Sequence, residues 1–520
     1  MPSINIKEVD NTIYRSTENS TNNIVFIPGA AITGPNNEPT LCESYNDFVT
    51  KFGSTSVSQS TAGTSWDMAA NILLNGFNVM YYRVVPETGV ARASADLIGL
   101  LVDGNNETEA TIGTVKEIYG GTGGNDLSFR ITKTTNSAYL KVYSGTSHRQ
   151  IESVWLYDIG ATEDEDKALF VKAIGNKLTT NYLEIEFTDS QTVAQSFTKV
   201  KYDSTSQYNT LSDGTDAVDS VIKEKIKDTF DTVSDKYLYD VKFVTSGGYT
   251  DAAGTSNGIN TAMVELCEKR GDCIAFIDIP LGTASNNVVN YFSNSGINTS
   301  YAAAYAPWAY MKLSTGTTKW MPPSYIFLYT LAGSISNGNR IWNPPAGVNR
   351  ATVTTIVNPE YEIGSALLDA WQNDTNLCIN PIMKIRNYGY VIYGQRTLYS
   401  VVNGDSEANS VLQELGVRIT ANEIKKLISD IAVSLTFEMN NIHTWNEFRG
   451  RLEPTLTEMK ENGGIIDYQI VMDASTTYPA DVDNNKIKGI VRVSISRAAE
   501  DFEIGFELHD SSVTFNDEEE

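Results

Sequence analysis

Apolar residues between positions 1 and 90 follow two different periods, which alternate along the chain. The runs 24–27 and 79–85 are short and apolar, which is typical of buried strands. Between them, residues 65–74 place apolar side chains on one face of a helix, and Gly76 follows where that helix would end. Residues 24–90 are therefore expected to form an α/β unit.

The same alternation returns in residues 236–310. Strands are expected at 241–244 and 273–279, and the helix expected at 259–270 is followed by Gly271. Alternating strands and helices are typical of an α/β sheet whose strands run parallel at least in part.

Between about 90 and 235 the composition shifts towards Gly, Thr, Ser and Asn. Alternating stretches at 139–143 and 183–187 predict short strands, and residues 217–234 predict one helix. We expect this segment to be an inserted domain, mostly β, at the periphery of the protein.

Two amphipathic helices are predicted after residue 400. Thr420 with Glu423, and Thr444 with Glu447, have the spacing of capping boxes, in which each side chain bonds the other residue's backbone N–H. Apolar residues at helical spacing follow each pair. We expect each box to begin a helix.

Alternating strands are also predicted near both ends of the chain, where one face of each strand is apolar. The apolar positions are Ile4 and Ile6 near the start, and Phe502, Ile504, Phe506 and Leu508 near the end. A Ser/Thr/Asn-rich linker follows the first strand, and an acidic tail follows the second. We expect these strands to join neighbouring subunits by adding to a sheet.

At roughly 150 residues per domain, 520 residues suggest about three or four domains. The predicted fold class is α+β or α/β, with an inner α/β core built from N- and C-terminal parts, an inserted peripheral mostly-β domain and extended terminal strand arms. The expected segments are 1–23 (strand arm and linker), 24–90 (α/β domain, first part), 91–235 (inserted domain), 236–400 (α/β domain, second part), 401–500 (C-terminal core domain, two helices plus strands) and 501–520 (strand arm and acidic tail).

The chain is strongly acidic, with a net charge of −25. Nucleic-acid binding relies on basic residues near phosphates, and anionic membranes attract basic segments, so neither partner is expected. Four cysteines in 520 residues include no Cys-x-x-Cys pair, which favours a reducing compartment. No signal peptide follows Met1 and no apolar run reaches transmembrane length, so we expect folding in a cytoplasm.

We expect no catalytic site, no cofactor and no bound metal. The three histidines, His148, His443 and His509, are far apart, and none stands in a zinc-binding pattern. The glycine-rich run 120–124 lacks the Lys-Ser/Thr pair of a phosphate-binding loop and precedes a predicted strand instead of a helix. Spacing alone leaves a Ser-His-Asp triad open, because triads assemble from distant residues.

Motifs in a fixed order along nearly the whole chain resemble the contractile tail sheath family. In the first part of the chain they are Phe26–Ala31, Gly34-Pro35, Asp47-Phe48, Phe52-Gly53, Tyr82–Val84 and Gly121–Asp126. Further along they are Asp278–Pro280, Tyr305–Trp308, Pro322–Ser324, Ala332-Gly333, the signature Pro344, Pro345, Ala346 and Gly347, and the signature Gly394, Arg396 and Thr397. Tyr393 and Gln395 depart from the residues that the family often has at these positions, which leaves the subfamily open.

The resemblance implies a structural subunit of a contractile tail sheath. Such subunits polymerise as stacked rings, commonly six-fold, around a tail tube, and they contract from a metastable extended state to drive the tube through a target envelope. The implied partners are further copies of the chain, the tail tube protein, and baseplate and tail terminator proteins. The implied location is the virion tail, after assembly in the host cytoplasm.

Two other classes of protein stay open at this point. One is a baseplate or receptor-binding component of a contractile injection system. The other is an enzyme that hydrolyses envelope polymers, against which the lack of a His, Cys or paired-carboxylate cluster argues.

Overall fold

A computed structural model of the chain describes residues 23–56, 64–87, 89–103, 106–175, 177–188, 197–204, 206–255, 258–372, 379–400 and 410–498. These residues fall into two compact units, which meet in the sequence between Glu423 and Ile424. Across the described ranges, no helix combines the length and apolar character needed to cross a membrane. The strands predicted near the two ends, at 4–6 and 502–508, lie outside the described residues.

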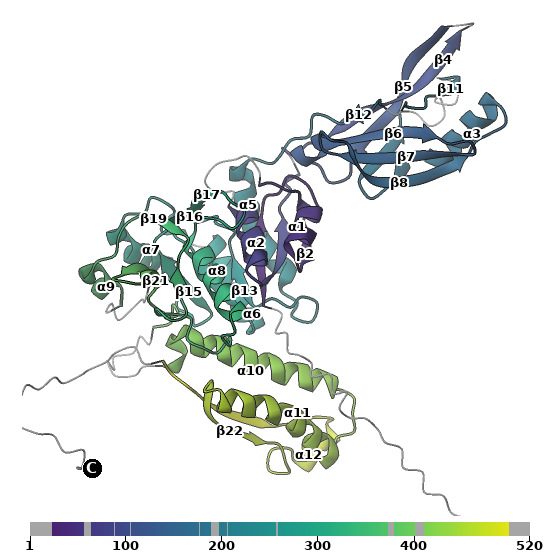
Figure 1. Ribbon diagram of the computed structural model, residues 1–520. Helices are drawn as coiled ribbons and strands as arrows, with labels where there is room; N and C mark the ends of the chain where they lie inside the picture. Colours follow the sequence, from purple (N-terminus) through teal and green to yellow (C-terminus); the bar gives the residue numbers. More distant parts are fainter. Residues whose placement is uncertain are drawn as a thin grey trace, which may run out of the picture. The chain divides into compact units, whose positions relative to one another are not determined.

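In its described part, the first unit is built around a mixed sheet of nine strands (Figure 1). Their order is β18 (Thr352–Val353), β21 (Gly389–Ile392), β20 (Asn380–Ile385), β15 (Ala302–Ala306), β14 (Ile274–Ile277), β13 (Phe243–Thr245), β1 (Ile24–Gly29), β3 (Asn78–Arg83) and β2 (Pro39–Cys42). Neighbours from β20 to β3 run parallel, and the pairs at both ends of the sheet are antiparallel. The prediction of a partly parallel α/β sheet is confirmed. Because β1 pairs with both β3 and β13, the segments before and after the insertion share one sheet.

Helices cover both faces of this sheet, because successive residues of a strand point to opposite sides. In β1, Val25 and Ile27 join one buried cluster, whereas Ile24 and Phe26 join the other. The first cluster also takes in residues of α1 (Tyr45–Phe52), α2 (Ser65–Leu74) and α8 (Pro323–Ser336). The second takes in residues of α5 (Asp219–Thr229), α6 (Ile259–Arg270), α7 (Val288–Ser295) and α9 (Ser365–Gln372). A strand that is buried on both faces has a continuous apolar sequence. The strand at 24–27 could be predicted for this reason.

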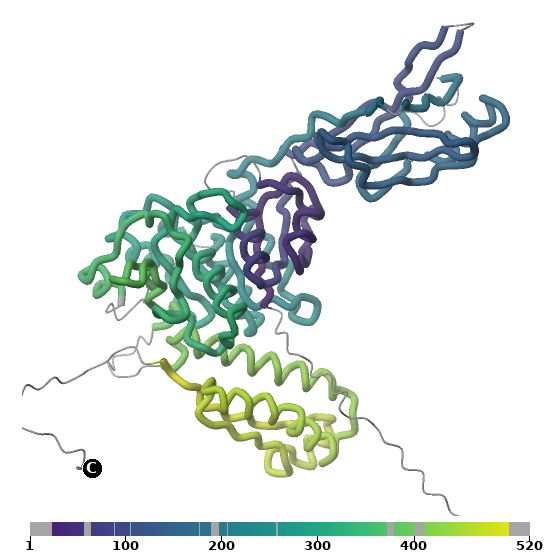
Figure 2. Tube along the Cα trace, in the orientation of Figure 1, coloured from purple at the N-terminus to yellow at the C-terminus, as the bar shows by residue number. Residues whose placement is uncertain are grey.

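The residues between β3 and α5 form two further sheets, and Figure 2 shows the path of the chain through them. One has the order β11 (Lys199–Val200), β4 (Ser94–Asp103), β5 (Asn106–Glu117), β10 (Leu183–Phe187) and β9 (Lys177–Thr179). The other has the order β12 (Asn209–Thr210), β6 (Leu127–Lys133), β7 (Ser137–Ser144) and β8 (Arg149–Asp158). With α3 (Glu163–Ile174) they enclose a separate core that includes Phe129, Leu140 and Phe170.

The expected boundary of the inserted domain at residue 235 remains a prediction. Helix α5 lies inside that boundary in the sequence, yet Ile222 and Ile226 belong to a core cluster of the central sheet. Phe230 and Val233, in the short 3₁₀ helix η2 (Phe230–Val233), join the same cluster. A further sheet of the first unit pairs β17 (Thr318–Met321) with β16 (Ala309–Lys312), and β16 with β19 (Ile356–Pro359).

Helix α10 (Leu415–Ser434) spans the sequence boundary between the two units. The second unit continues with α11 (Ile442–Glu461), α12 (Pro479–Asp483) and an antiparallel pair of strands, β22 (Ile465–Val471) and β23 (Ile490–Ile495). Two helices followed by strands is what the apolar pattern predicts for this region.

The predicted capping boxes were wrong about where these helices begin. Thr420 lies inside α10, and its hydroxyl donates to the Gly416 carbonyl at 2.8 Å. The cap of α11 is Asn441, whose side-chain oxygen accepts from the N–H groups of His443 and Thr444 at 2.9 and 3.2 Å. A Thr with a Glu three residues later also arises inside a helix, where the two residues face the same side, so the pattern alone misplaces the start.

Candidate functional site

Residues with catalytic or metal-binding chemistry are scattered through the described ranges. His148 stacks on Tyr208 with ring centroids 3.7 Å apart, and His443 lies in the first turn of α11. Three described cysteines are free and buried: Cys42, Cys267 and Cys273. Within the same ranges, no group of three or more His, Cys, Asp or Glu could hold a metal ion. His509 and Cys378 lie outside the described residues.

The structure brings together sequence motifs that are distant along the chain. Two of them meet at Arg83, the last residue of β3, where the insertion leaves the central sheet. The side chain of Arg83 is buried. Its guanidinium donates to the carbonyls of Ala31 at 3.0 Å, Gly34 at 2.8 Å and Gly120 at 2.7 Å. Burial lowers the pKa of Arg83 to about 10, although the nearby Glu117 carboxylate acts in the opposite direction. Arg83 therefore stays charged at neutral pH and joins β3 to the glycine loop.

The glycine loop itself is held from two sides. Gly121 has a φ of +113°, and a Cβ on it would lie 2.2 Å from the carbonyl oxygen of Ile32, so only glycine fits. The N–H of Gly123 donates to that same carbonyl at 2.9 Å. On the other side, the Asp216 carboxylate accepts from the N–H and the hydroxyl of Thr122 at 2.8 and 2.6 Å.

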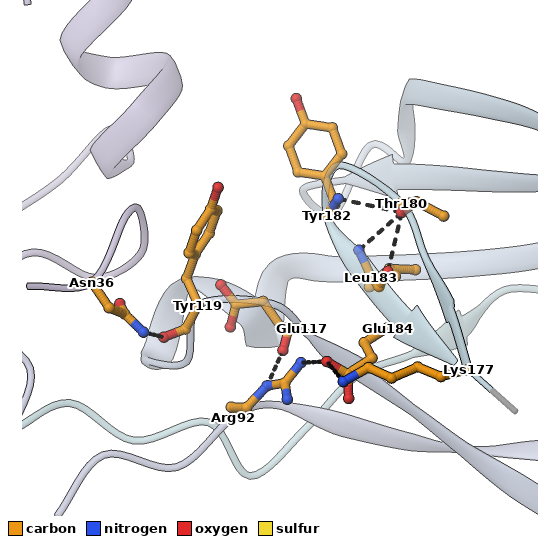
Figure 3. A network of polar contacts seen from close by, with 9 residues as sticks. All are labelled: Asn36, Arg92, Glu117, Tyr119, Lys177, Thr180, Tyr182, Leu183 and Glu184. Atoms are coloured by element: carbon orange, nitrogen blue, oxygen red, sulfur yellow. Dashed lines mark hydrogen bonds and ion pairs between the residues drawn. The ribbon is translucent and has the colours of Figure 1, made fainter. Parts of the chain in front are cut away.

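A second polar network ties the root of the insertion to its own sheet (Figure 3). The Asn36 side chain donates to the Tyr119 carbonyl at 2.7 Å. Arg92 and Lys177 both pair with the same carboxylate oxygen of Glu184, at 3.1 and 2.8 Å. Partly exposed ion pairs of this kind contribute at most about 1 kcal/mol each, so the buried bonds of Arg83 dominate the joint.

The predicted signature at Gly394, Arg396 and Thr397 lies beside β20 and the residues that lead into α10. A Cβ on Gly394 would lie 2.9 Å from the side-chain oxygen of Asn380. That oxygen accepts from the N–H of Arg396 at 2.6 Å, and the Asn380 amide donates to the Arg396 carbonyl at 2.8 Å. The N–H of Thr397 donates to the Gln413 carbonyl at 2.8 Å. This segment therefore connects the central sheet to the start of α10.

The other predicted signature, Pro344–Gly347, forms a turn that precedes β18. Gly347 has a φ of +89°, a conformation that favours glycine. Its N–H donates to the carbonyl of Ile392 at 3.0 Å, and its carbonyl accepts from the N–H of Ala351 at 2.9 Å. The turn thus sets where β18 pairs with β21 at the edge of the sheet.

The second unit contains a two-stranded sheet with two edges. Among the described residues, β22 and β23 pair only with each other. An edge strand presents N–H and C=O groups to which a further strand can pair. The six residues of the predicted strand arms lie outside the described residues, so their pairing stays a prediction: Ile4, Ile6, Phe502, Ile504, Phe506 and Leu508.

Sequence reasoning missed the role of Asn380 and the contacts of Arg83. A signal was present in both places, because each is a polar residue next to apolar residues at one end of a strand. A buried polar side chain needs hydrogen-bond partners, so such a residue indicates a backbone contact.

No model of a known protein family matches the chain. The tail sheath protein of Enterobacteria phage T4 is 25% identical over 307 residues, which cover 56% of this chain and 45% of that protein. The tail sheath protein of Vibrio phage KVP40 is 24% identical over 257 residues, which cover 44% of this chain and 36% of that protein. The chain therefore spans less than half the length of these curated relatives.

Among solved structures, a sheath tail protein from Listeria innocua is similar with a TM-score of 0.56 at 13% identity, over 91% of this chain and 95% of that one. At this identity the likeness shows the fold, which is the mixed α/β fold of sheath tail proteins. In sequence, the chain is similar to the tail sheath proteins of two contractile-tailed phages, in agreement with the ordered motifs. The resemblance predicted from the motifs is confirmed.

Proposed function

We propose that this chain is the structural subunit of a contractile tail sheath. Copies of it polymerise as stacked rings around a tail tube and contract from a metastable extended state, which drives the tube through the target envelope. The observation that carries the proposal is the sequence match to the tail sheath proteins of two phages. The fold likeness to a sheath tail protein over 91% of the chain supports it.

The proposed arrangement has an inner α/β core and the insertion at the periphery. The partners are further copies of the chain, the tail tube protein, and baseplate and tail terminator proteins; the site of action is the virion tail. A net charge of −25 supports partners other than nucleic acid or anionic membranes.

Contraction requires subunits that keep their shape while their contacts change. The central sheet supports this, because residues on both of its faces are buried and such packed cores resist deformation. An open helical polymer also needs heterologous contacts that do not close on themselves. Added strands at the edges of the β22–β23 sheet would supply links that persist while bodies rotate.

The proposal includes no catalytic step. The work of contraction comes from the free-energy difference between two sets of contacts among identical subunits, and a population trapped in the less stable set releases it when triggered.

Negative-stain electron microscopy of the purified full chain tests this function. The expected result is tubes of uniform width, formed alone or on added tail tube protein. Closed rings or single particles that never elongate, at any protein concentration or in the presence of tube protein, would favour a baseplate component instead.

A further inference from the structure

A polar cavity of about 270 Å³ lies at the C-terminal end of α8. Its described lining comes from that helix end, from Asn75 after α2, and from residues 349–354 after the Pro344–Gly347 turn. The lining includes Asn337, Asn349 and Arg350, and it contains no Asp or Glu. In a chain with a net charge of −25, a cavity with one cation and no carboxylate favours an anionic group.

Arg350 is the one charged residue in the described lining of this cavity. Within the described ranges, no hydrogen bond, ion pair or ring contact engages its guanidinium, and the amides of Asn337 and Asn349 are likewise unengaged. Arg350 is partly exposed, and Asn337 and Asn349 are exposed, so a partner from outside the subunit can reach all three side chains. The buried guanidinium of Arg270, by comparison, pairs with Asp272 and donates to the Val233 carbonyl. Arg350 and the two amides therefore present donors that the fold itself does not use.

These donors match a carboxylate. A guanidinium carries a planar fork of N–H groups that binds both carboxylate oxygens at once, and side-chain amides add further donors. The volume is just under the roughly 300–1,000 Å³ of pockets for small molecules, so it suits one or two side chains better than a nucleotide.

We propose that this cavity binds the carboxylates of an acidic segment from a second copy of the chain. This inference rests on the proposed sheath function, because it needs copies that pack side by side. It adds a specific joint to that function: a cation site at the end of α8 that receives an acidic segment of a neighbour.

Two runs of four consecutive acidic residues are candidates for that segment, Glu163–Asp166 and Asp517–Glu520. The first run is already engaged within its own subunit, where its carboxylates pair with Lys199 at 3.2 Å and accept from the Ala161 N–H at 2.9 Å and the Tyr202 hydroxyl at 2.8 Å. We therefore assign the second run, which lies outside the described residues.

The test measures binding of a peptide with the sequence of residues 515–520, Phe-Asn-Asp-Glu-Glu-Glu, to the full chain by titration calorimetry. A control peptide replaces Asp and Glu by Asn and Gln. The variant Arg350→Gln should raise the dissociation constant about tenfold, because it removes charge-assisted hydrogen bonds. Arg350→Lys keeps the charge but not the planar fork of N–H groups, so its dissociation constant should lie between those of wild type and Arg350→Gln. Arg149→Gln removes an exposed arginine of β8 and should leave binding unchanged.

Equal binding to wild type and Arg350→Gln, or equal binding of both peptides, overturns the proposal. Melting curves of each variant show whether a loss of binding reflects a loss of folding, and Arg350→Lys gives a folded comparison if Arg350→Gln melts early. Electron microscopy separates this inference from the sheath function. If the wild type forms tubes but peptide binding does not depend on Arg350, the sheath function is supported and the acidic joint is refuted. If peptide binding depends on Arg350 but no tubes form, the cavity binds the acidic segment and the sheath function is refuted.

Discussion

The carboxylate of Asp278 accepts two hydrogen bonds from Ser324, one from its backbone N–H at 2.8 Å and one from its hydroxyl at 2.5 Å. Ser324 lies in the first turn of α8, so the carboxylate satisfies an N–H that the helix leaves unpaired. No ion pair reaches Asp278 from the described residues. Burial raises the pKa of Asp278 to about 7, and the two bonds from Ser324 act in the opposite direction.

The raised pKa of Asp278 predicts that stability depends on pH. The folded protein holds this proton more tightly than the unfolded chain, whose carboxyl has a pKa near the ordinary value of 3.8. The contribution is therefore fully present at acidic pH and is lost as pH rises towards 7. Relative to Asp278→Asn, wild type should lose on the order of a few kcal/mol of unfolding free energy between pH 5 and 8. Urea denaturation across that range measures it, and a constant difference between the two proteins would refute it.

Removal of the insertion is predicted to leave a folded body. The chain enters and leaves the insertion side by side, since Ser94 and Ser212 exchange backbone hydrogen bonds of 2.8 and 3.0 Å. Replacing residues 94–212 by a short Gly/Ser linker should therefore give a soluble protein that melts cooperatively and still forms tubes. Sedimentation and electron microscopy measure both properties.

The matched control for that deletion extends it from 94 to 234, which also removes α5 and η2. Ile222 and Ile226 are at most 1% exposed in the core of the central sheet, and loss of each such side chain costs about 2–5 kcal/mol. The longer deletion should be insoluble. Equal solubility of the two proteins would show that α5 belongs with the insertion, which agrees with the boundary expected at residue 235.

Arg83 is predicted to be essential to the root of the insertion. A lysine carries a charge but not the planar fork, so Arg83→Lys leaves some of the buried carbonyls at Ala31, Gly34 and Gly120 without donors. Each unpaired buried carbonyl costs about 1–3 kcal/mol, so the expected loss is at least about 2 kcal/mol. Urea unfolding measures it. Arg149→Lys makes the same change on an exposed surface and should have no effect, and a similar loss in both variants would contradict the assignment.

The elements that could be predicted from the sequence are those whose pattern is local. The helices at 65–74 and 259–270 were predicted at their observed ends, because an apolar face and a terminal glycine lie within one short segment. The contact of Arg83 with Gly120, and that of Asp278 with Ser324, join residues 37 and 46 positions apart. No local period in the sequence encodes such pairings. Each motif could therefore be recognised by itself, but the contacts between motifs could not be predicted.

The same limit applies to the Arg350 cavity. Its lining combines a residue after α2, the end of α8 and residues 349–354 around β18, and none of these segments carries a motif for anion binding. Only the fold shows that a guanidinium and two amides in this region have no partners among the described residues.

The terminal strands are predicted to link subunits, and one face of the second strand should carry that link. The apolar positions of the predicted strand include Phe502 and Phe506, and each is followed in the sequence by a glutamate, Glu503 or Glu507. Main-chain hydrogen bonds give an added strand its affinity, and the side chains of the buried face set its register. Phe502→Ser with Phe506→Ser should therefore abolish tubes in electron micrographs, because each buried aromatic contributes about 2–3 kcal/mol at a joint.

Glu503→Ser with Glu507→Ser is the matched control, since it changes the same strand on its other face and should leave tubes intact. Deletion of residues 502–520 should give a monomer that melts near the wild-type temperature, because the sheet that accepts the strand belongs to a neighbour. A deleted protein that still forms tubes would show that the strand is no link. One that unfolds would show that the strand completes the β22–β23 sheet of its own subunit.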